Sequence, residues 1–184
     1  AVTTYDDGAW HHVLATYESG TILIYVDGVL VDMGTDDGGT LGSFSNAVNV
    51  RIGADTDGNY FPGSVDEVRI YDRVLSAEEA AKLYKASAPD DPDTGLKAYY
   101  PFNGPDISGT TAYDRSGAGN SGTLTNGPVP AIGRMGQGLN FDGTDDYVET
   151  ASQIDVTGSK TVSFWMKADT LDANNRRIFY SSNG

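Results

Sequence analysis

Short runs of alternating apolar and polar residues, separated by Gly and Asp, recur along the whole chain. Alternation with a period of two is typical of half-buried strands, and the chain holds 23 glycines with which to turn between them. Asp27-Gly28, between residues 21–26 and 29–31, predicts a two-residue hairpin, because both turn positions favour positive φ. The pattern as a whole predicts an all-β sandwich. The expected strands cover residues 13–17, 21–26, 29–31, 48–52, 64–71, 98–102, 138–141, 147–150, 161–167 and 177–180.

One segment departs from this pattern. Residues 76–79 read Ser-Ala-Glu-Glu, a capping box in which Ser76 caps a helix and Glu79 reaches back to it. We expect this helix to run to about residue 84, with its basic residues near the negative end of the helix dipole. Residues 86–95 (Ala-Ser-Ala-Pro-Asp-Asp-Pro-Asp-Thr-Gly) follow it and have the composition of a linker.

The charge balance and the absence of cysteine narrow the range of partners. The chain has 12 Lys and Arg against 26 Asp and Glu, and its formal net charge is −14. This charge repels phosphate backbones, so nucleic acid is not an expected partner. Disulfides and thiolate zinc sites are excluded because the cysteine count is 0. No apolar run approaches the roughly 20 residues that span a bilayer, so membrane insertion is not expected. The chain starts in a strand-like pattern, and we interpret it as a fragment of something longer.

Several stretches together are similar to a known family. In the first half these are residues 8–13 (Gly-Ala-Trp-His-His-Val), 23–28 (Leu-Ile-Tyr-Val-Asp-Gly) and 63–76 (Gly-Ser-Val-Asp-Glu-Val-Arg-Ile-Tyr-Asp-Arg-Val-Leu-Ser). In the second half they are residues 99–102 (Tyr-Tyr-Pro-Phe), 114–122 (Asp-Arg-Ser-Gly-Ala-Gly-Asn-Ser-Gly), 141–148 (Phe-Asp-Gly-Thr-Asp-Asp-Tyr-Val) and 162–167 (Val-Ser-Phe-Trp-Met-Lys). The chain therefore resembles the laminin-G-like, concanavalin A-like lectin and glucanase jelly roll, with its two halves in permuted order.

The resemblance implies a concanavalin A-like jelly-roll β-sandwich of two antiparallel sheets, with one short helix near 76–84. Residues 1–85 match the C-terminal half of the usual order, residues 96–184 match the N-terminal half, and residues 86–95 link them. A slice through a tandem array and a true circular permutant both explain this order. In either case we expect one jelly roll over residues 1–184, as a monomer or as a domain-swapped dimer, because half a sandwich leaves strand edges open.

The loop from Asp114 to Gly122 is a candidate cation site. It alternates carboxylate, hydroxyl, amide and Gly, so hard oxygen ligands of the kind Ca²⁺ prefers could converge there. The resemblance assigns a structural calcium to positions that match Asp114, Asn120 and Asp66. The alternative is a tight turn held by Asx hydrogen bonds without an ion.

The loop formed by residues 55–63, Asp-Thr-Asp-Gly-Asn-Tyr-Phe-Pro-Gly, is a candidate sugar-binding loop. Aromatic faces stack on the apolar faces of sugars, while carboxylates and amides bind hydroxyls. Asp57, Asn59 and Tyr60 are therefore the candidate ligand-binding residues. The resemblance assigns Phe61 to the core instead.

Two other polar groups favour structural interpretations. Asp142, Asp145 and Asp146 form an acidic cluster, for which a solvated hairpin loop is the preferred interpretation, because Asp and Gly are ordinary turn residues. His11 and His12 are adjacent, so in a strand they point to opposite faces and cannot share one metal. Neither group is expected to carry catalysis.

Catalysis as a whole is not expected. Glycoside hydrolysis needs two carboxylates that face each other across a sugar. Glucanases of this fold carry Glu-x-Asp-x-x-Glu on one strand, whereas Asp66 and Glu67 are adjacent here and point to opposite sides. The expected function is a non-catalytic carbohydrate-binding or adhesion module of a secreted or cell-surface protein, whose partner is a polysaccharide, a glycoconjugate or a protein surface. The alternative is a structural spacer or protein-interaction module without a sugar site, and a hydrolase ranks last.

Overall fold

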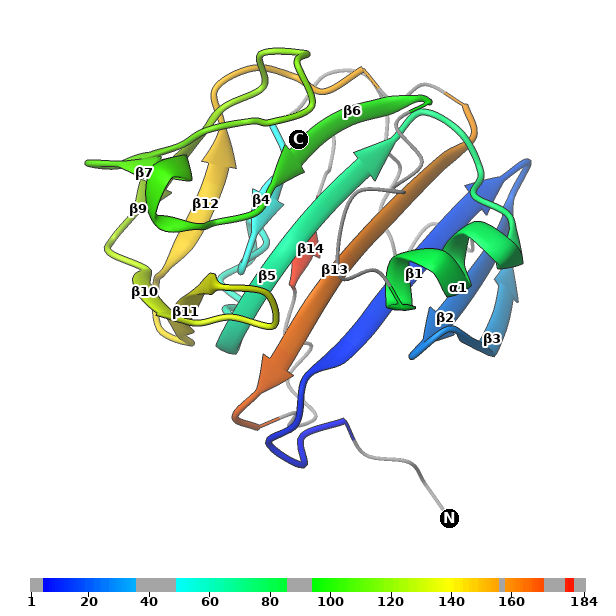
Figure 1. Ribbon diagram of the computed structural model, residues 1–184, viewed down its shortest axis with the longest axis horizontal. Coiled ribbons are helices and arrows are strands. Elements are labelled where there is room, and N and C mark those ends of the chain that lie inside the picture. The colour runs from blue at the N-terminus through cyan, green and yellow to red at the C-terminus, as the bar shows by residue number, and fades with distance from the viewer. Residues whose placement is uncertain (1–4, 36–48, 86–93, 156–157, 171–177, 181–184) are drawn as a thin grey trace.

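The computed structural model describes residues 5–35, 49–85, 94–155, 158–170 and 178–180. Its strands form two antiparallel sheets, and a helix covers the outer face of one of them (Figure 1). The eight-stranded sheet consists of β1 (His11–Glu18), β2 (Thr21–Val26), β3 (Val29–Thr35), β5 (Pro62–Tyr71), β6 (Leu96–Tyr100), β10 (Val129–Ile132), β11 (Gln137–Asp142) and β13 (Lys160–Ala168). The six-stranded sheet consists of β4 (Arg51–Ile52), β7 (Ile107–Ser108), β8 (Thr111–Ala112), β9 (Gly122–Thr125), β12 (Tyr147–Thr150) and β14 (Phe179–Tyr180). The expected β-sandwich of two antiparallel sheets with one short helix is confirmed.

Strands from the two halves of the sequence pair with each other within each sheet. In the eight-stranded sheet, β5 pairs with β13 on one side and with β6 and β11 on the other. On the far side of β13 lies β1, in a register that places His11 opposite Met166. In the six-stranded sheet, β4 lies between β12 and β14. Of the expected linker 86–95, residues 86–93 lie outside the described part of the chain.

The main hydrophobic core lies between the two sheets. It contains large, fully buried side chains of both halves, among them Phe61, Tyr100, Phe102, Phe141 and Leu139. Phe61 is 0% exposed, which confirms its expected place in the core. Because burying apolar side chains is the main driving force of folding, this layer is what holds the sheets together.

A second, smaller core lies between the eight-stranded sheet and the helix α1 (Ala77–Lys85), which crosses β1 in Figure 1. Ala80 and Leu83 are buried on this side, and the Tyr84 ring stacks on Trp165 with 5.7 Å between ring centroids. The capping box is confirmed: Ser76 N donates to Glu79 Oε2 at 2.8 Å, and Glu79 N donates to Ser76 Oγ at 3.2 Å. Among the described residues, the structure contains no helix that could span a bilayer.

The hairpin between β2 and β3 turns where the sequence predicts. Asp27 and Gly28 have φ values of +51° and +76°, both in the left-handed region. A Cβ at Gly28 would lie 3.1 Å from Tyr84 Cδ1, so the same glycine also lets the turn approach α1. This tight turn joins the outermost hairpin of the eight-stranded sheet.

Residues 104–132 hold elements that the alternation did not predict. They form the 3₁₀ helix η1 (Gly104–Asp106) and the strands β7, β8, β9 and β10, each of two to four residues. Such strands are too short to show a period, and β10 contains Pro130 while β9 begins at Gly122. Strand β10 is an edge strand of the eight-stranded sheet, whereas β9, β8 and β7 follow β12 in the six-stranded sheet and form one side of it.

Candidate functional site

The outer face of the six-stranded sheet carries an aromatic and charged surface centred on Arg51. Val148 and Ile52 are buried in the core, so their strand neighbours Tyr147, Glu149 and Arg51 point outward. The pairing of β4 with β12 and β14 places Arg51 opposite both Glu149 and Tyr180. Arg51 Nε donates to Glu149 Oε1 at 2.8 Å.

Arg51 connects this face to the loop that the sequence singled out. Its guanidinium lies 4.6 Å from the centroid of the Tyr147 ring, and its Nη1 donates to the backbone oxygen of Asp55 at 3.2 Å. Burial acts to lower the pKa of Arg51, but the hydrogen bond to Glu149 and the negative fields of Glu149, Tyr147 and Tyr60 raise this pKa on balance. We call Arg51, Tyr60, Tyr147, Glu149 and Tyr180 the Arg51 platform.

The candidate sugar-binding loop is organised around a buried carboxylate. Asp55 is 1% exposed, and its Oδ1 accepts the N–H groups of Asp57 at 2.8 Å and Asn59 at 3.0 Å. The side chain of Asn59 donates to Asp55 Oδ2 at 2.7 Å, while Asp57 is exposed. Tyr60 is half-buried and forms a β-bridge with Ala54. Asp57, Asn59 and Tyr60 therefore belong to one fixed loop, and Tyr60 is the member next to Arg51.

In the loop of the expected calcium site, the carboxylate of Asp114 accepts hydrogen bonds from groups of the protein itself. Asp114 Oδ1 accepts the N–H groups of Tyr99 and Ser116 at 2.9 and 2.8 Å. Asp114 Oδ2 accepts the Ser116 hydroxyl at 2.8 Å and the Asn120 N–H at 2.9 Å. The amide oxygen of Asn120 accepts the hydroxyl of Ser152 at 3.1 Å. These contacts fit the Asx-turn alternative, because four donors already occupy the carboxylate of Asp114.

Asp66, the third expected calcium ligand, contacts a different segment. Its Oδ2 accepts the N–H of Met135 at 2.9 Å, and it makes no hydrogen bond to Asp114 or Asn120 in the described structure. The side chain is 0% exposed, and Oδ1 has no hydrogen-bond partner among the described residues. Burial raises the pKa of Asp66 to about 7. The described contacts therefore join Asp114 to Asn120, whereas those of Asp66 run to the turn before β11.

The neighbouring acid, Glu67, is committed to a buried ion pair. Its φ of +56° coincides with a bulge in the pairing of β5 with β13. Glu67 Oε2 accepts Arg69 Nη2 at 2.8 Å and the Tyr99 hydroxyl at 2.7 Å. Asp66 and Glu67 thus contact different groups: Asp66 accepts from Met135, and Glu67 accepts from Arg69 and Tyr99. These contacts do not place the two carboxylates across a cleft from each other, as glycoside hydrolysis requires.

The acidic cluster lies in the hairpin loop between β11 and β12. Ligand oxygens of Asp142, Asp145 and Asp146 all lie within 4.8 Å of one another. Asp146 Oδ2 accepts the N–H of Asp142 at 3.1 Å, and Asp142 Oδ1 accepts the N–H of Thr144 at 2.7 Å. These internal bonds are those of the ordinary turn that the sequence favoured.

The two histidines face opposite sides of β1, as expected. His11 lies between two carboxylates, with Nδ1 2.8 Å from Asp27 Oδ2 and Nε2 3.1 Å from Asp7 Oδ1. His12 is 2% exposed, its Nε2 lies 2.9 Å from Ser163 Oγ, and burial together with the field of Arg69 lowers its pKa to about 4. His12 is therefore neutral at physiological pH.

Comparison with known proteins finds a family to which the first half of the chain is similar. Residues 1–81 match the model of the Concanavalin A-like lectin/glucanases superfamily. Adhesion G-protein coupled receptor V1 of Danio rerio is 30% identical over 89 residues, which are 48% of this chain and 1% of the receptor. Sushi, von Willebrand factor type A, EGF and pentraxin domain-containing protein 1 of Mus musculus is 30% identical over 125 residues, which are 60% of this chain and 3% of that protein.

The chain thus spans only a few per cent of the length of these curated relatives. No solved structure matches it significantly. The resemblance to the laminin-G-like, concanavalin A-like jelly rolls is confirmed by the match over residues 1–81, and the two antiparallel sheets of the chain are a concanavalin A-like β-sandwich.

Proposed function

We propose that this chain is a non-catalytic carbohydrate-binding or adhesion module of a secreted or cell-surface protein, folded as one jelly roll from its two halves. The family match supports an adhesion or interaction module, and one relative is by name an adhesion receptor. The sugar-binding part of this proposal rests on the Arg51 platform. There, tyrosines from the outer face of the six-stranded sheet and from the loop 55–63 surround the ion pair between Arg51 and Glu149. A polysaccharide or glycoconjugate is the proposed ligand.

The platform offers both kinds of contact that sugars need. Tyr60, Tyr147 and Tyr180 are half-buried, so part of each ring is open to a sugar while the rest is fixed by the protein. The Tyr180 hydroxyl is held 2.9 Å from Thr56 Oγ1. Arg51 and Glu149 keep further donors and lone pairs besides their mutual bond, and these can pair with sugar hydroxyls. Stacking on a tyrosine face supplies the apolar part of the binding energy.

The proposal is tested by screening the chain on a broad array of glycans and polysaccharides, then measuring the Kd of each hit. Tyr147→Ala is expected to weaken binding about tenfold, since an aromatic contact of this kind contributes about 1 kcal/mol beyond the buried area. Tyr113→Ala is the matched control, because Tyr113 is 40% exposed but lies on the turn after β8. An empty array with a folded protein refutes the sugar-binding function.

The second candidate is a structural spacer or protein-interaction module without a sugar site. It is favoured by the small share of the relatives that the chain covers, 1% and 3%, since a short module in a very long protein serves well as a spacer. An empty glycan array would favour this function. Capture of a specific protein partner, unaffected by Tyr147→Ala, would support the interaction module.

Calcium is a separate part of the proposal. The resemblance implies a calcium ion, and oxygen ligands suit this ion best in flexible acidic loops. The loop of Asp142, Asp145 and Asp146 is the proposed place for an ion, because ligand oxygens of all three lie within 4.8 Å of one another, although Asp142 and Asp146 also accept N–H groups of the turn. Tm is expected to rise with added calcium relative to chelator by an amount set by the calcium concentration over Kd. Asp145→Asn should remove that rise and Asp114→Asn should not; the reverse result would restore the Asp114 site.

A further inference from the structure

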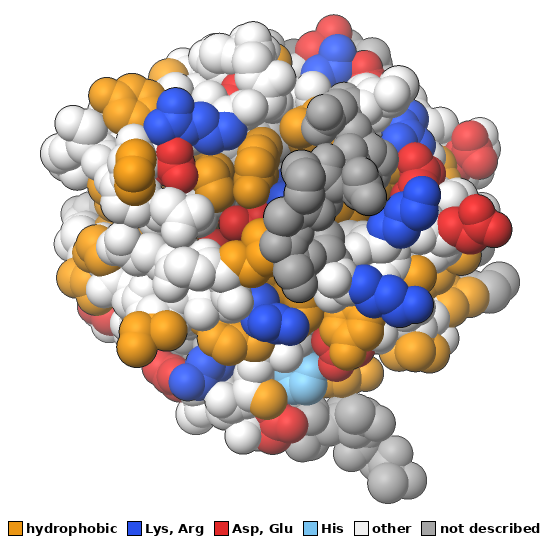
Figure 2. Space-filling view, in the orientation of Figure 1, with side chains coloured by type: hydrophobic (Ala, Val, Ile, Leu, Met, Phe, Trp, Pro, Cys, Tyr) orange, Lys and Arg blue, Asp and Glu red, His pale blue; other side chains and the backbone are white. Residues whose placement is uncertain are grey.

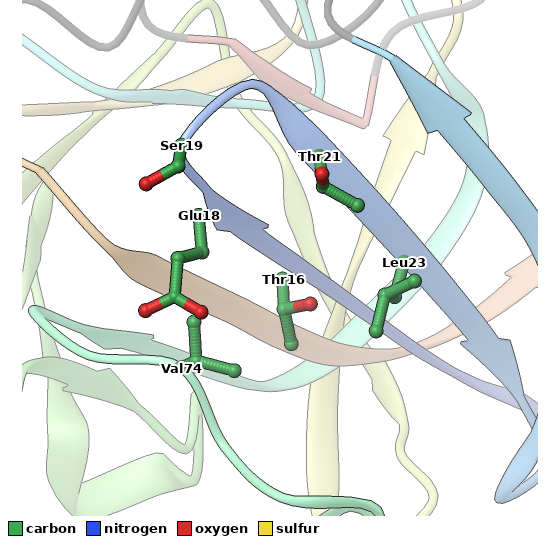
Figure 3. A pocket seen from close by; sticks show the side chains of 6 residues that line it. All are labelled: Thr16, Glu18, Ser19, Thr21, Leu23 and Val74. Atoms are coloured by element: carbon green, nitrogen blue, oxygen red, sulfur yellow. The ribbon is translucent and has the colours of Figure 1, made fainter.

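We infer that the outer face of the β1–β2 hairpin holds a second carbohydrate subsite, which takes one neutral sugar residue; this inference rests on the proposed function. A hollow of about 320 Å³ lies there, on the face of the sheet that carries α1. Figure 3 shows its lining side chains, which are Thr16, Glu18, Ser19, Thr21, Leu23 and Val74. The hollow is separate from the Arg51 platform, which lies on the other sheet.

The hollow exists because the apolar packing under α1 stops before the hairpin ends. Leu14 and Tyr25 pair in register and are buried beneath the helix. Farther along the same face the register pairs Thr16 with Leu23 and Glu18 with Thr21, and these side chains are mostly shorter or polar. Val74, on the segment that leads into α1, closes one side.

The lining is fixed before any ligand arrives. Thr16 is only 2% exposed, so its hydroxyl lies at the inner end of the hollow. Ser19 and Gly20 join β1 to β2 with φ values of +49° and +83°, a tight turn that holds the Ser19 side chain at the rim. The carboxylate of Glu18 accepts a hydrogen bond from Ser159 Oγ at 3.2 Å, which anchors one of its oxygens. A preorganised site of this kind loses little entropy on binding.

The chemistry of the six side chains selects a neutral polyhydroxylated ligand. Three hydroxyls can donate or accept, and Glu18 accepts, so each can pair with a sugar hydroxyl. Leu23 and Val74 supply apolar contact for the C–H groups of a sugar ring. None of the six is cationic, so phosphate and carboxylate ligands gain no charge pairing. The volume of about 320 Å³ is at the low end for ligand pockets, which limits the occupant to about one sugar residue.

The test is an amide NMR titration of the ¹⁵N-labelled chain with glucose, galactose, mannose and N-acetylglucosamine in turn. Because polar ligands gain little binding free energy per atom, we expect a Kd on the order of 1 mM for the best sugar. The amide chemical shifts that change on binding should be those of residues 16–23. The double variant Glu18→Gln and Thr21→Val should weaken this binding at least about tenfold, because it removes the negative charge of one acceptor and the hydroxyl of another side chain. Thr123→Val, an exposed threonine on β9 of the other sheet, is the matched control and should leave it unchanged.

The outcomes separate this inference from the proposed function. Shifts confined to residues near Tyr147 would overturn the second subsite and leave the platform standing. Shifts at residues 16–23 without any near Tyr147 would support the subsite and count against the platform. The cationic probe Nα-acetyl-lysine amide is the further control. If it shifts the amide signals of residues 16–23 when no sugar does, the hollow is a cation site and the inference is overturned. Absence of shifts at residues 16–23 with every sugar would overturn the second subsite, whereas the glycan array decides the platform.

Discussion

Asp66 should make the stability of this chain fall as the pH rises through the neutral range. Its carboxyl group is 0% exposed, accepts one N–H from the turn before β11, and lies beside the acidic Glu67 and the backbone of Arg134. Burial raises the pKa of Asp66 from its ordinary value of 3.8 to about 7. At a pH between these two pKa values, Asp66 of the folded chain therefore keeps a proton that Asp66 of the unfolded chain has lost.

The size of the effect follows from the two pKa values. Below about pH 4 both states bind the proton and the contribution of Asp66 to stability is complete. From there to about pH 7 the free energy of unfolding should fall by about 1.4 kcal/mol per pH unit, and above pH 7 it should level off. The total loss is about 4 kcal/mol, a large part of the stability of a typical domain.

Urea unfolding followed by tryptophan fluorescence at a series of pH values measures this directly. Asp66→Asn keeps an oxygen that can accept the N–H of Met135 and cannot ionise, so the stability of the variant relative to the wild type should increase steadily from pH 4.5 to pH 7.5. The difference between the two proteins cancels other titrating groups, and Asp57→Asn at an exposed position controls for the substitution itself. A difference that stays constant over this range would refute the reasoning.

Three further substitutions test the packing. Ser76→Ala removes the helix cap and should cost about 1 kcal/mol, seen as a lower urea midpoint; an unchanged midpoint would mean that the cap is dispensable. Gly53 has a φ of +93°, and the Cβ of Gly53→Ala would lie 2.5 Å from a ring carbon of Phe141, so this substitution should cost more than about 2 kcal/mol. Gly58 has a φ of +84° and open space around it, so Gly58→Ala measures the backbone cost alone. If the two Tm losses are equal, the predicted clash is absent. Tyr99→Phe removes the hydroxyl bonded to the buried Glu67 and should cost about 1–3 kcal/mol, and an unaltered unfolding curve would contradict that bond.

The fold was predictable where its signals are local. The Asp27-Gly28 turn requires two left-handed residues, and the Ser76–Glu79 box satisfies the first turn of a helix, so each is visible in a few neighbouring residues. The long strands show their alternation for the same reason. Strands β7 to β10 were missed because two to four residues cannot display a period, and their partners, not their sequences, make them strands.

The candidate site was predictable only in part, because its members come from distant segments. Tyr60 and its loop carry a compositional signal, whereas Arg51 and Tyr147 are 96 positions apart and meet through the pairing of β4 with β12. The outward position of Tyr147 in an alternating strand was the one signal that could have found it. Whether Asp114 faces an ion or its own loop depends on the direction of backbone N–H groups, which residue types do not reveal.

The pairing of strands from the two halves within the eight-stranded sheet also dictates when this chain can fold during its synthesis. Strands β1 and β5 are synthesised before their shared neighbour β13, which begins only at Lys160. Until then both strands have unpaired backbone edges and an uncovered apolar face, which is the state most prone to aggregation. Contacts such as that of His11 with Met166 join positions that are far apart in the sequence, so we expect these strands to pair slowly.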